Sequence, residues 1–192
     1  GRFPVQTKEE AGIVIAKIER YLTTSEPFFG NWRNRICLIA DDEDGNLHLE
    51  QADSLSNGFI PKLYNQQKIY LDSYTQVKTP SGFRYPDVTN ALNDAVNKGA
   101  FIVNYVGHGG KAGWAHERIL QSTDILNWKN KDKLPVFITA TCEFSRFDEP
   151  ELKTGGEMVL LNPEGGGIAL LTTTRLAYSQ SNFTLNQQVY ST

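Results

Sequence analysis

Two residues that can act together on a carbonyl group stand at the ends of two apolar runs. Residues 100–106 (AFIVNYV) form the first run, which ends in glycines that flank His108. Residues 134–141 (LPVFITAT) form the second run, which ends in Cys142, 34 positions after the histidine. A thiolate can attack a carbonyl carbon, and a histidine can protonate the departing amine. The pattern predicts Cys142 as nucleophile, His108 as general acid and base, and the N–H groups of Gly109 and Cys142 as oxyanion donors.

Each of these residues taken alone has a simpler interpretation. A histidine between glycines is often only a turn residue, and a cysteine in a buried strand usually packs as a small hydrophobe. The combination favours chemistry, because open parallel sheets bind their ligands at the carboxyl ends of the strands. Neighbouring strands lie ~4.8 Å apart, so adjacent placement of the two runs would bring the imidazole and the thiol to one cleft.

Two other motifs fit the same letters less well. Residues 107–112 (GHGGKA) satisfy the G-x-G-x-x-A dinucleotide fingerprint, but that fingerprint must open a helix and the chain here continues as a loop. A zinc site formed by His108, His116 and Cys142 has acceptable ligand types. Its spacing, however, matches no tight pair of ligands on a helix or a knuckle.

An acidic run follows a third apolar run, residues 35–40 (RICLIA), and is expected at the same edge of the sheet. Three interpretations stay open for it. It is a solvated turn, a calcium site that uses the hard oxygen ligands of Asp41, Asp42 and Asp44, or the source of a carboxylate that orients His108. Thiol catalysis itself requires no cofactor.

Helices and strands alternate along the chain. Hydrophobic spacing and capping residues predict helices over residues 7–23, 48–58, 86–98, 123–128, 155–161 and from 179 onward. Apolar runs predict strands over residues 35–40, 68–73, 100–106, 134–141 and 168–174, a turn over 79–82, and loops over 25–34 and 143–154. This order predicts an α/β fold, a doubly wound and mostly parallel sheet with helices on both faces.

The composition is that of an ordinary globular domain. The chain has 192 residues, of which 40% are hydrophobic and 21% are charged, enough for one α/β domain with a full core. The net charge of −3 and the lack of a basic run argue against a nucleic-acid partner. No apolar run reaches the ~18 to 20 residues of a membrane span. We expect one domain over residues 1–192, as an excerpt of a longer catalytic region.

The chain has two cysteines, too few for a disulfide framework. Cys37 lies inside the apolar run 35–40 and is expected to be a buried core thiol. We therefore expect no bond between Cys37 and Cys142, and the cysteine content leaves the cellular compartment undecided.

Several blocks of the sequence resemble the gingipain-type cysteine peptidases, peptidase family C25 of the caspase-like clan. VNYVGHGG followed by Trp114 is similar to the histidine block of that family, in which a tryptophan falls six residues after the histidine. VFITATC is similar to the cysteine block, and GGGIALLTTTR to the glycine-led strand that follows it. The segments GRFPVQTKEEA and ATCEFSRFDEPELKTGGE resemble more specifically the type IX secretion sortase branch.

The resemblance implies a caspase-like fold. It also implies that His108 and Cys142 are the catalytic dyad and that Gly109 is an oxyanion donor. It implies that Trp114 forms a wall of the cleft, and we assign His48 and Thr173 to the substrate pocket with it. Arginine-specific gingipains carry an aspartate near the position of His48, so the resemblance argues for a preference for small or polar residues instead. A structural calcium ion at residues 41–44 is also in keeping with the family.

Two functions follow as alternatives. The first is a sortase-like cysteine endopeptidase or transpeptidase that cleaves C-terminal sorting domains from secreted cargo. By resemblance, it would act outside the cytoplasm at the cell surface or outer membrane, with other secretion-system subunits as partners. The second is a catalytically silent module that binds peptide C-termini within a secretion complex. The presence of both His108 and Cys142 favours the enzyme.

Overall fold

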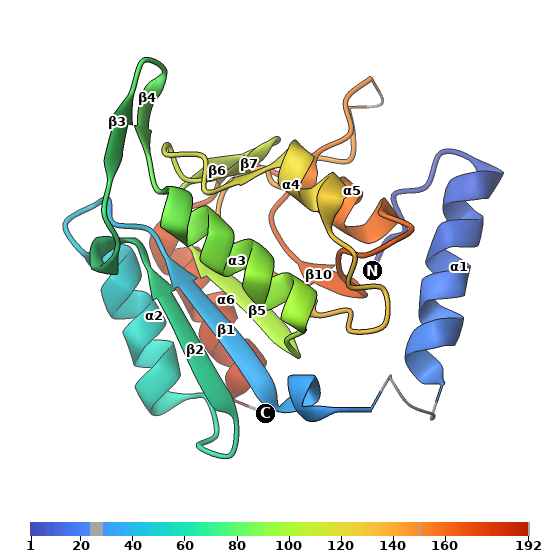
Figure 1. Ribbon diagram of the computed structural model, residues 1–192, viewed down its shortest axis with the longest axis horizontal. Coiled ribbons are helices and arrows are strands. Elements are labelled where there is room, and N and C mark those ends of the chain that lie inside the picture. Colours follow the sequence, from blue (N-terminus) through green and yellow to red (C-terminus); the bar gives the residue numbers. More distant parts are fainter. Residues whose placement is uncertain (24–28, 150, 192) are drawn as a thin grey trace.

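A parallel sheet forms the centre of the molecule. Figure 1 shows the computed structural model, which describes residues 1–23, 29–149 and 151–191. In these residues five strands pair in the order β10-β9-β5-β1-β2, all of them parallel. The strands are β1 (Arg35–Ala40), β2 (Asn65–Tyr70), β5 (Ile102–Val106), β9 (Val136–Ala140) and β10 (Ala169–Leu171). The predicted α/β fold with a parallel sheet is confirmed.

Helices cover both faces of this sheet (Figure 1). Their bounds are α1 (Lys8–Leu22), α2 (Leu47–Gly58), α3 (Pro86–Lys98), α4 (Ser122–Asn127), α5 (Gly155–Leu161) and α6 (Ser179–Tyr190). One core lies between the sheet and α3, α4 and α5, and a second lies between the sheet and α2 and α6. Helix α1 packs outside these layers, where Val14 meets Leu160 and Leu161 of α5.

The helix that leads into β5 is fixed at both ends by residues suited to those positions. Pro86 is the first residue of α3, where its missing N–H costs no helical hydrogen bond. Gly99 ends the helix with φ at 92°, and a Cβ atom there would lie 2.9 Å from the Cβ of Trp32. Only glycine fits this turn, so the chain passes directly from α3 into the buried strand β5.

The structure differs from the predictions mainly at the margins of the sheet. Strand β2 begins at Asn65, three residues before the predicted start. Its first four residues are polar and only its last two are buried, so no apolar run marks where it begins. The strand predicted to reach residue 73 ends at Tyr70 and is followed by a 3-10 turn, Leu71–Ser73. Strand β10 has three residues, so the segment leading to α6 is irregular.

Two small antiparallel sheets lie beside the central one. The glycine-rich region after His108, which was expected to be a loop, forms β6 (Gly109–Gly110), β7 (Gly113–Trp114) and β8 (Leu120–Gln121). The predicted turn at residues 79–82 connects the hairpin β3 (Val77–Thr79) and β4 (Gly82–Arg84), which projects from the molecule in Figure 1.

The predicted loops are described only in part. Residues 24–28 of the first loop lie outside the described residues, and Asn31–Asn34 form a 3-10 turn. Pro150 of the second loop also lies outside them. In the described parts of the chain, no helix combines the length and the apolar character needed to cross a membrane.

Candidate active site

The two candidate catalytic residues follow neighbouring strands at equivalent positions. Strands β5 and β9 pair in register, and Val106 lies opposite Ala140. His108 and Cys142 each lie two residues beyond this pair. The register continues past the strands, because the N–H of Gly107 donates to the carbonyl of Ala140 at 3.2 Å. Both residues therefore stand at the carboxyl edge of the sheet, where ligands bind in this kind of fold.

The backbone N–H and the backbone carbonyl of His108 both form hydrogen bonds with side chains. Its N–H donates to Oδ2 of Asp41 at 2.8 Å, and its carbonyl accepts the hydroxyl of Tyr105 at 2.6 Å. A Cβ atom on Gly107 would lie 2.4 Å from the Cβ of Asp41 and 2.5 Å from the hydroxyl of Tyr105. The glycine before the histidine is thus required by the close approach of these two side chains.

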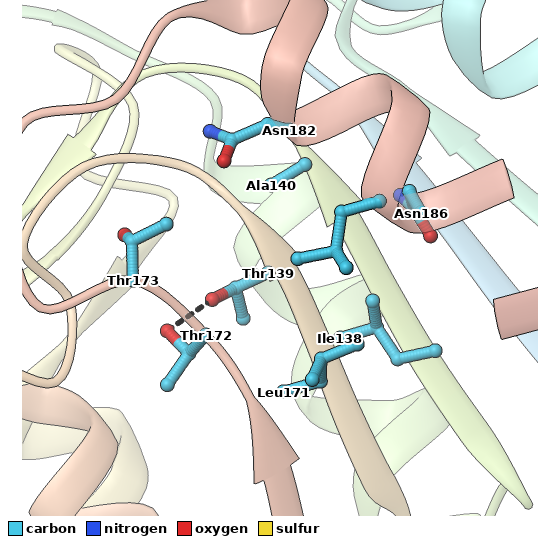
Figure 2. Close-up of a pocket in the computed structure, with 9 residues that line it drawn as sticks. Ile138, Thr139, Ala140, Leu171, Thr172, Thr173, Asn182 and Asn186 are labelled. Atoms are coloured by element: carbon cyan, nitrogen blue, oxygen red, sulfur yellow. Dashed lines mark hydrogen bonds between the residues drawn. The ribbon is translucent and has the colours of Figure 1, made fainter. Parts of the chain in front are cut away.

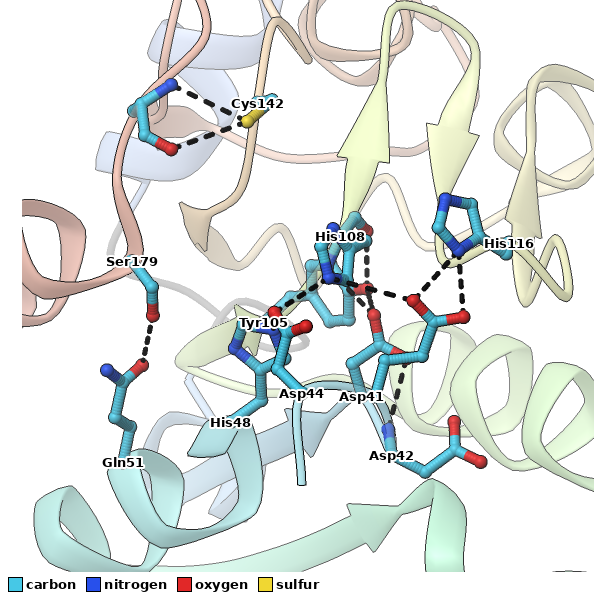
Figure 3. A network of polar contacts seen from close by, with 12 residues as sticks. Asp41, Asp42, Asp44, His48, Gln51, Tyr105, His108, His116, Cys142 and Ser179 are labelled. Atoms are coloured by element: carbon cyan, nitrogen blue, oxygen red, sulfur yellow. Dashed lines mark hydrogen bonds and ion pairs between the residues drawn. The ribbon is translucent and has the colours of Figure 1, made fainter. Parts of the chain in front are cut away.

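The acidic run lies beside the ring of His108 (Figure 3). Nε2 of the ring is 3.0 Å from Oδ2 of Asp44 and 3.7 Å from Oε2 of Glu43. The imidazole is 36% exposed, so a substrate can reach it. Because Nε2 faces the carboxylates, Nδ1 is the nitrogen that remains for exchange of a proton with a substrate. This geometry supports the interpretation of the acidic run as the source of an orienting carboxylate.

All three histidines of the chain meet at this point. The ring of His48 packs edge-to-face on His108 with 5.3 Å between centroids, and His116 stacks on the same ring at 5.2 Å. His116 pairs with Glu43 at 2.8 Å, and this hydrogen bond raises its pKa. Burial lowers the pKa of His48, and the charge of His108 adds to that effect.

His48 is placed differently from the sequence expectation. It is only 4% exposed, so it supports His108 within the protein and does not line an open substrate pocket. Its Nε2 lies 3.4 Å from Oδ2 of Asp44, close enough for an ion pair, but the alignment does not form a hydrogen bond. The reason is the position of His48 in the first turn of α2, where its ring packs against the ring of His108.

Cys142 is a free and partly exposed thiol. Its Sγ donates to the carbonyl of Ala177 and accepts the N–H of the same residue, both at 3.5 Å (Figure 3). The segment before α6 therefore holds the thiol. Cys37 is also free but fully buried, and burial raises its pKa to about 12. The prediction that the two cysteines do not pair is confirmed.

Gly109 brings the segment after His108 close to the segment of Cys142. A Cβ atom at Gly109 would lie 2.4 Å from Oγ1 of Thr141, the residue before the cysteine. The backbone of Gly109 thus runs against the end of β9 with no room for a side chain. An oxyanion donor beside the thiol needs such an approach.

Trp114 does not form a wall of the cleft. Its side chain is fully buried and stacks on Tyr105 with 4.5 Å between centroids and 5° between planes. Phe137 and Phe144 complete its surroundings. Pairing of β6 with β7 turns the chain back over the core, so the tryptophan supports the His108 segment from below.

Thr173 lies at a small hollow between β9, β10 and α6 (Figure 2). Its hydroxyl donates to the carbonyl of Thr141, which links the segment after β10 to the strand that carries Cys142. The hollow has a cavity volume of about 20 Å³, room for roughly one water molecule. It is too small for a peptide side chain, so the structure gives Thr173 a positioning contact near the nucleophile.

The structure does not support the dinucleotide fingerprint or the zinc site. Strand β6 lies within the G-x-G-x-x-A match and β7 directly follows it, so no helix opens there to bind a pyrophosphate. The thiol of Cys142 contacts Ala177, whereas His108 and His116 face acidic residues, so these three do not form a zinc site.

Among the described residues, two other groups of side chains have the spacing of metal ligands. Ligand atoms within 4.8 Å of one another occur in Asp41, His48 and His108, and in Asp41, Asp42 and Glu117. Asp44 of the expected calcium set is directed to the histidines. Glu117 was not found from the sequence, because it lies far from the acidic run along the chain and no local spacing connects them.

The sheet, its two helical layers and the strand-end positions of His108 and Cys142 define an α/β fold of the caspase-like class. The crystal structure of the Arg-specific cysteine proteinase gingipain R matches with a TM-score of 0.78 at 20% identity, covering 98% of this chain and 42% of that one. The complex of Porphyromonas gingivalis RgpB pro- and mature domains matches with a TM-score of 0.76 at 20% identity, covering 98% and 43%.

A third structure, described only as a protease, matches with a TM-score of 0.74 at 20% identity, covering 93% of this chain and 37% of that one. The chain belongs to peptidase family C25, whose family model matches residues 1–192. No curated protein matches it significantly. The chain spans less than half the length of the matched structures. The family identified from the sequence blocks is therefore confirmed.

Proposed function

We propose that this chain carries the catalytic dyad of a cysteine peptidase. The observation that supports it most directly is the equivalent position of His108 and Cys142 beyond the paired residues Val106 and Ala140 on neighbouring strands. Membership of peptidase family C25 supports the same reaction class. The exposed face of the His108 ring and the partly exposed thiol are both accessible to a peptide.

In the proposed reaction, Sγ of Cys142 attacks the carbonyl carbon of the scissile peptide bond as a thiolate. The carbon–nitrogen bond breaks, the leaving amine takes a proton from His108, and a thioester remains on the cysteine. Water or an amine acceptor then attacks the thioester and gives a proton to His108, the carbon–sulfur bond breaks, and Cys142 is released as the thiolate. The N–H groups of Gly109 and Cys142 are the proposed donors to the oxygen that carries the negative charge.

Asp44 is proposed as the residue that positions the histidine. Its Oδ2 lies 3.0 Å from Nε2, so it fixes the orientation of the ring. Because Asp44 is half-exposed, we expect its contribution to be smaller than that of a buried carboxylate.

The proposed substrates are the C-terminal sorting domains of secreted cargo proteins, cleaved or transferred outside the cytoplasm at the cell surface. Support comes from the sequence blocks GRFPVQTKEEA and ATCEFSRFDEPELKTGGE, which resemble the type IX secretion sortases. Partner subunits of a secretion complex and association with the outer membrane follow from the same resemblance. These finer assignments are independent of the dyad and need their own test.

The peptidase assignment can be tested by labelling the full-length protein with a peptidyl acyloxymethyl ketone. We expect one adduct on Cys142 by mass spectrometry, its loss in Cys142→Ala, and its retention in Cys37→Ala, which removes only the buried thiol. His108→Ala should lower peptide cleavage by about 10² to 10⁴-fold. No adduct, together with retained peptide binding, would favour the silent binding module.

The substrate assignment can be tested separately with a cargo protein that carries a C-terminal sorting domain. We expect wild-type protein to release the domain and Cys142→Ala to leave it intact. Adding an amine acceptor distinguishes transfer from hydrolysis by the mass of the new cargo end. Labelling of Cys142 without cargo cleavage would contradict the sortase proposal and leave the peptidase proposal standing.

A further inference from the structure

The peptide group between Thr141 and Cys142 is fixed by two hydrogen-bond donors. Its oxygen, the carbonyl of Thr141, accepts the hydroxyl of Thr173 at 2.5 Å and Nδ2 of Asn182 at 3.3 Å. The two donors come from different elements, since Thr173 follows β10 and Asn182 belongs to α6 (Figure 2). A carbonyl oxygen has two lone pairs, so this oxygen accepts both hydrogen bonds at once.

The N–H of Cys142 is the other end of the same peptide group. In the ranges that the structure describes, it donates to no backbone carbonyl. The oxygen and the hydrogen of a trans peptide group lie in one plane and point in opposite directions. Two donors that fix the direction of the Thr141 carbonyl therefore also fix the direction of the Cys142 N–H.

Both donors are themselves held in place by other contacts. Asn182 is buried, and Asn186, one turn later on α6, exchanges two hydrogen bonds of 2.7 and 3.1 Å with the buried Asn104 of β5. The carbonyl of Thr173 accepts the N–H of Ser145 at 3.0 Å. The donors are therefore in position before any substrate binds, as electrostatic stabilisation of a transition state requires.

We propose that Thr173 and Asn182 are positioning residues of the oxyanion hole and act through the peptide group between Thr141 and Cys142. They hold the Cys142 N–H in one orientation. Because hydrogen bonds in a chain polarise one another, they also make this N–H a stronger donor. The inference rests on the proposed function, in which the Cys142 N–H stabilises the charged oxygen. No sequence pattern singles out Asn182, because its contact with Thr141 joins distant segments.

The test compares two reagents that react with the same thiol. A peptide aldehyde accepts Sγ of Cys142 at its carbonyl carbon and forms a hemithioacetal, whose oxygen takes the place of the oxyanion. Iodoacetamide is attacked at a saturated carbon and releases iodide, so no oxyanion forms. A weaker oxyanion donor therefore affects only the aldehyde, whereas a displaced thiol affects both reagents.

Both reagents, and a fluorogenic peptide, are applied to full-length wild type, Thr173→Val and Asn182→Leu. Loss of a direct oxyanion donor costs about 10² to 10³-fold in kcat, and these residues act through one, so we expect each variant to lose about tenfold in kcat and in affinity for the aldehyde. KM and the rate of alkylation of Cys142, followed by mass spectrometry, should stay within about twofold of wild type. Thr173→Ser keeps the hydroxyl and should recover most of the loss. The matched control Thr184→Val removes an exposed hydroxyl of α6 and should behave like wild type.

Four results would overturn the inference: both variants cleave like an active wild type, alkylation slows as much as cleavage, the loss lies only in KM, or Thr173→Ser is as impaired as Thr173→Val. Tm is measured on every sample. Because Thr173 and Asn182 lie on different elements, a variant that fails to fold leaves the other as the test. Failure of the proposed function gives a different pattern, in which wild type itself neither cleaves the peptide nor binds the aldehyde but is still alkylated.

Discussion

Replacing Gly109 by alanine should disable the site while leaving the fold intact. An added Cβ would lie 2.4 Å from Oγ1 of Thr141 and 3.0 Å from the carbonyl oxygen of Gly113, whereas ordinary contacts begin at 3.4 Å. The Gly109 segment must therefore move by about 1 Å away from Thr141, the neighbour of Cys142. A shift of that size in a catalytic site costs on the order of 10²-fold in rate.

The assay is kcat/KM on a fluorogenic peptide, with Tm measured on the same samples. Gly110→Ala is the matched control, because a Cβ atom at Gly110 would meet nothing within 4 Å. We expect Gly109→Ala to lose about 10²-fold in kcat/KM, and Gly110→Ala to stay within a few-fold of wild type. Both should keep a Tm close to that of wild type.

A second substitution tests whether the contact with Thr141 is the cause. The hydroxyl of Thr141 has no hydrogen-bond partner among the described residues, so Thr141→Ala alone should be tolerated. Combined with Gly109→Ala it removes the closest clash and should restore at least about tenfold of the lost activity. Wild-type activity of Gly109→Ala, or a double variant no better than the single one, would refute the reasoning.

Three further substitutions test the contact to His108, the anchoring of α1 and the packing of the core. Asp44→Asn removes the anion 3.0 Å from the ring of His108 and should lower kcat/KM by about tenfold or more, whereas Asp94→Asn, which breaks only an exposed pair with Lys98, should leave it unchanged. Lys17→Met leaves four carbonyl oxygens at 2.8 to 3.3 Å without their donor and should lower Tm by about 5 to 10 °C in calorimetry, unlike the exposed Lys8→Met. Trp114→Ala should cost about 3 to 5 kcal/mol of unfolding free energy in urea, since the ring is fully buried; a cost below about 1 kcal/mol would contradict its place in the core.

The central elements could be predicted because local pattern and burial coincide in them. Strand β1 was predicted with the observed bounds, because the five residues after Arg35 are all apolar, and in the structure all five are buried. Helix α5 was predicted with the observed bounds as well, and the structure shows Thr154 and Glu157 forming a capping box at its start. In both cases the sequence signal lies within a few residues of the element itself.

The rest depends on contacts between distant segments. Trp114 follows a glycine-rich stretch and looks exposed in sequence, but pairing of β6 with β7 turns it onto Tyr105. His48 sits near the start of a helix, and only the proximity of β5 shows that it lies under His108. Glu117 lies near Asp42 because the turn between β7 and β8 brings it there, and no hydrophobic periodicity of the sequence predicts this contact.

The histidine cluster has a practical consequence. The chain contains three histidines, and each ring contacts another within the cluster. Imidazole proton resonances, or the histidine adducts formed by diethyl pyrocarbonate, therefore report on this one place, because no other histidine occurs in the chain. Occupancy of the centre by a peptide, an inhibitor or an ion can be followed in unlabelled material without introducing any foreign group.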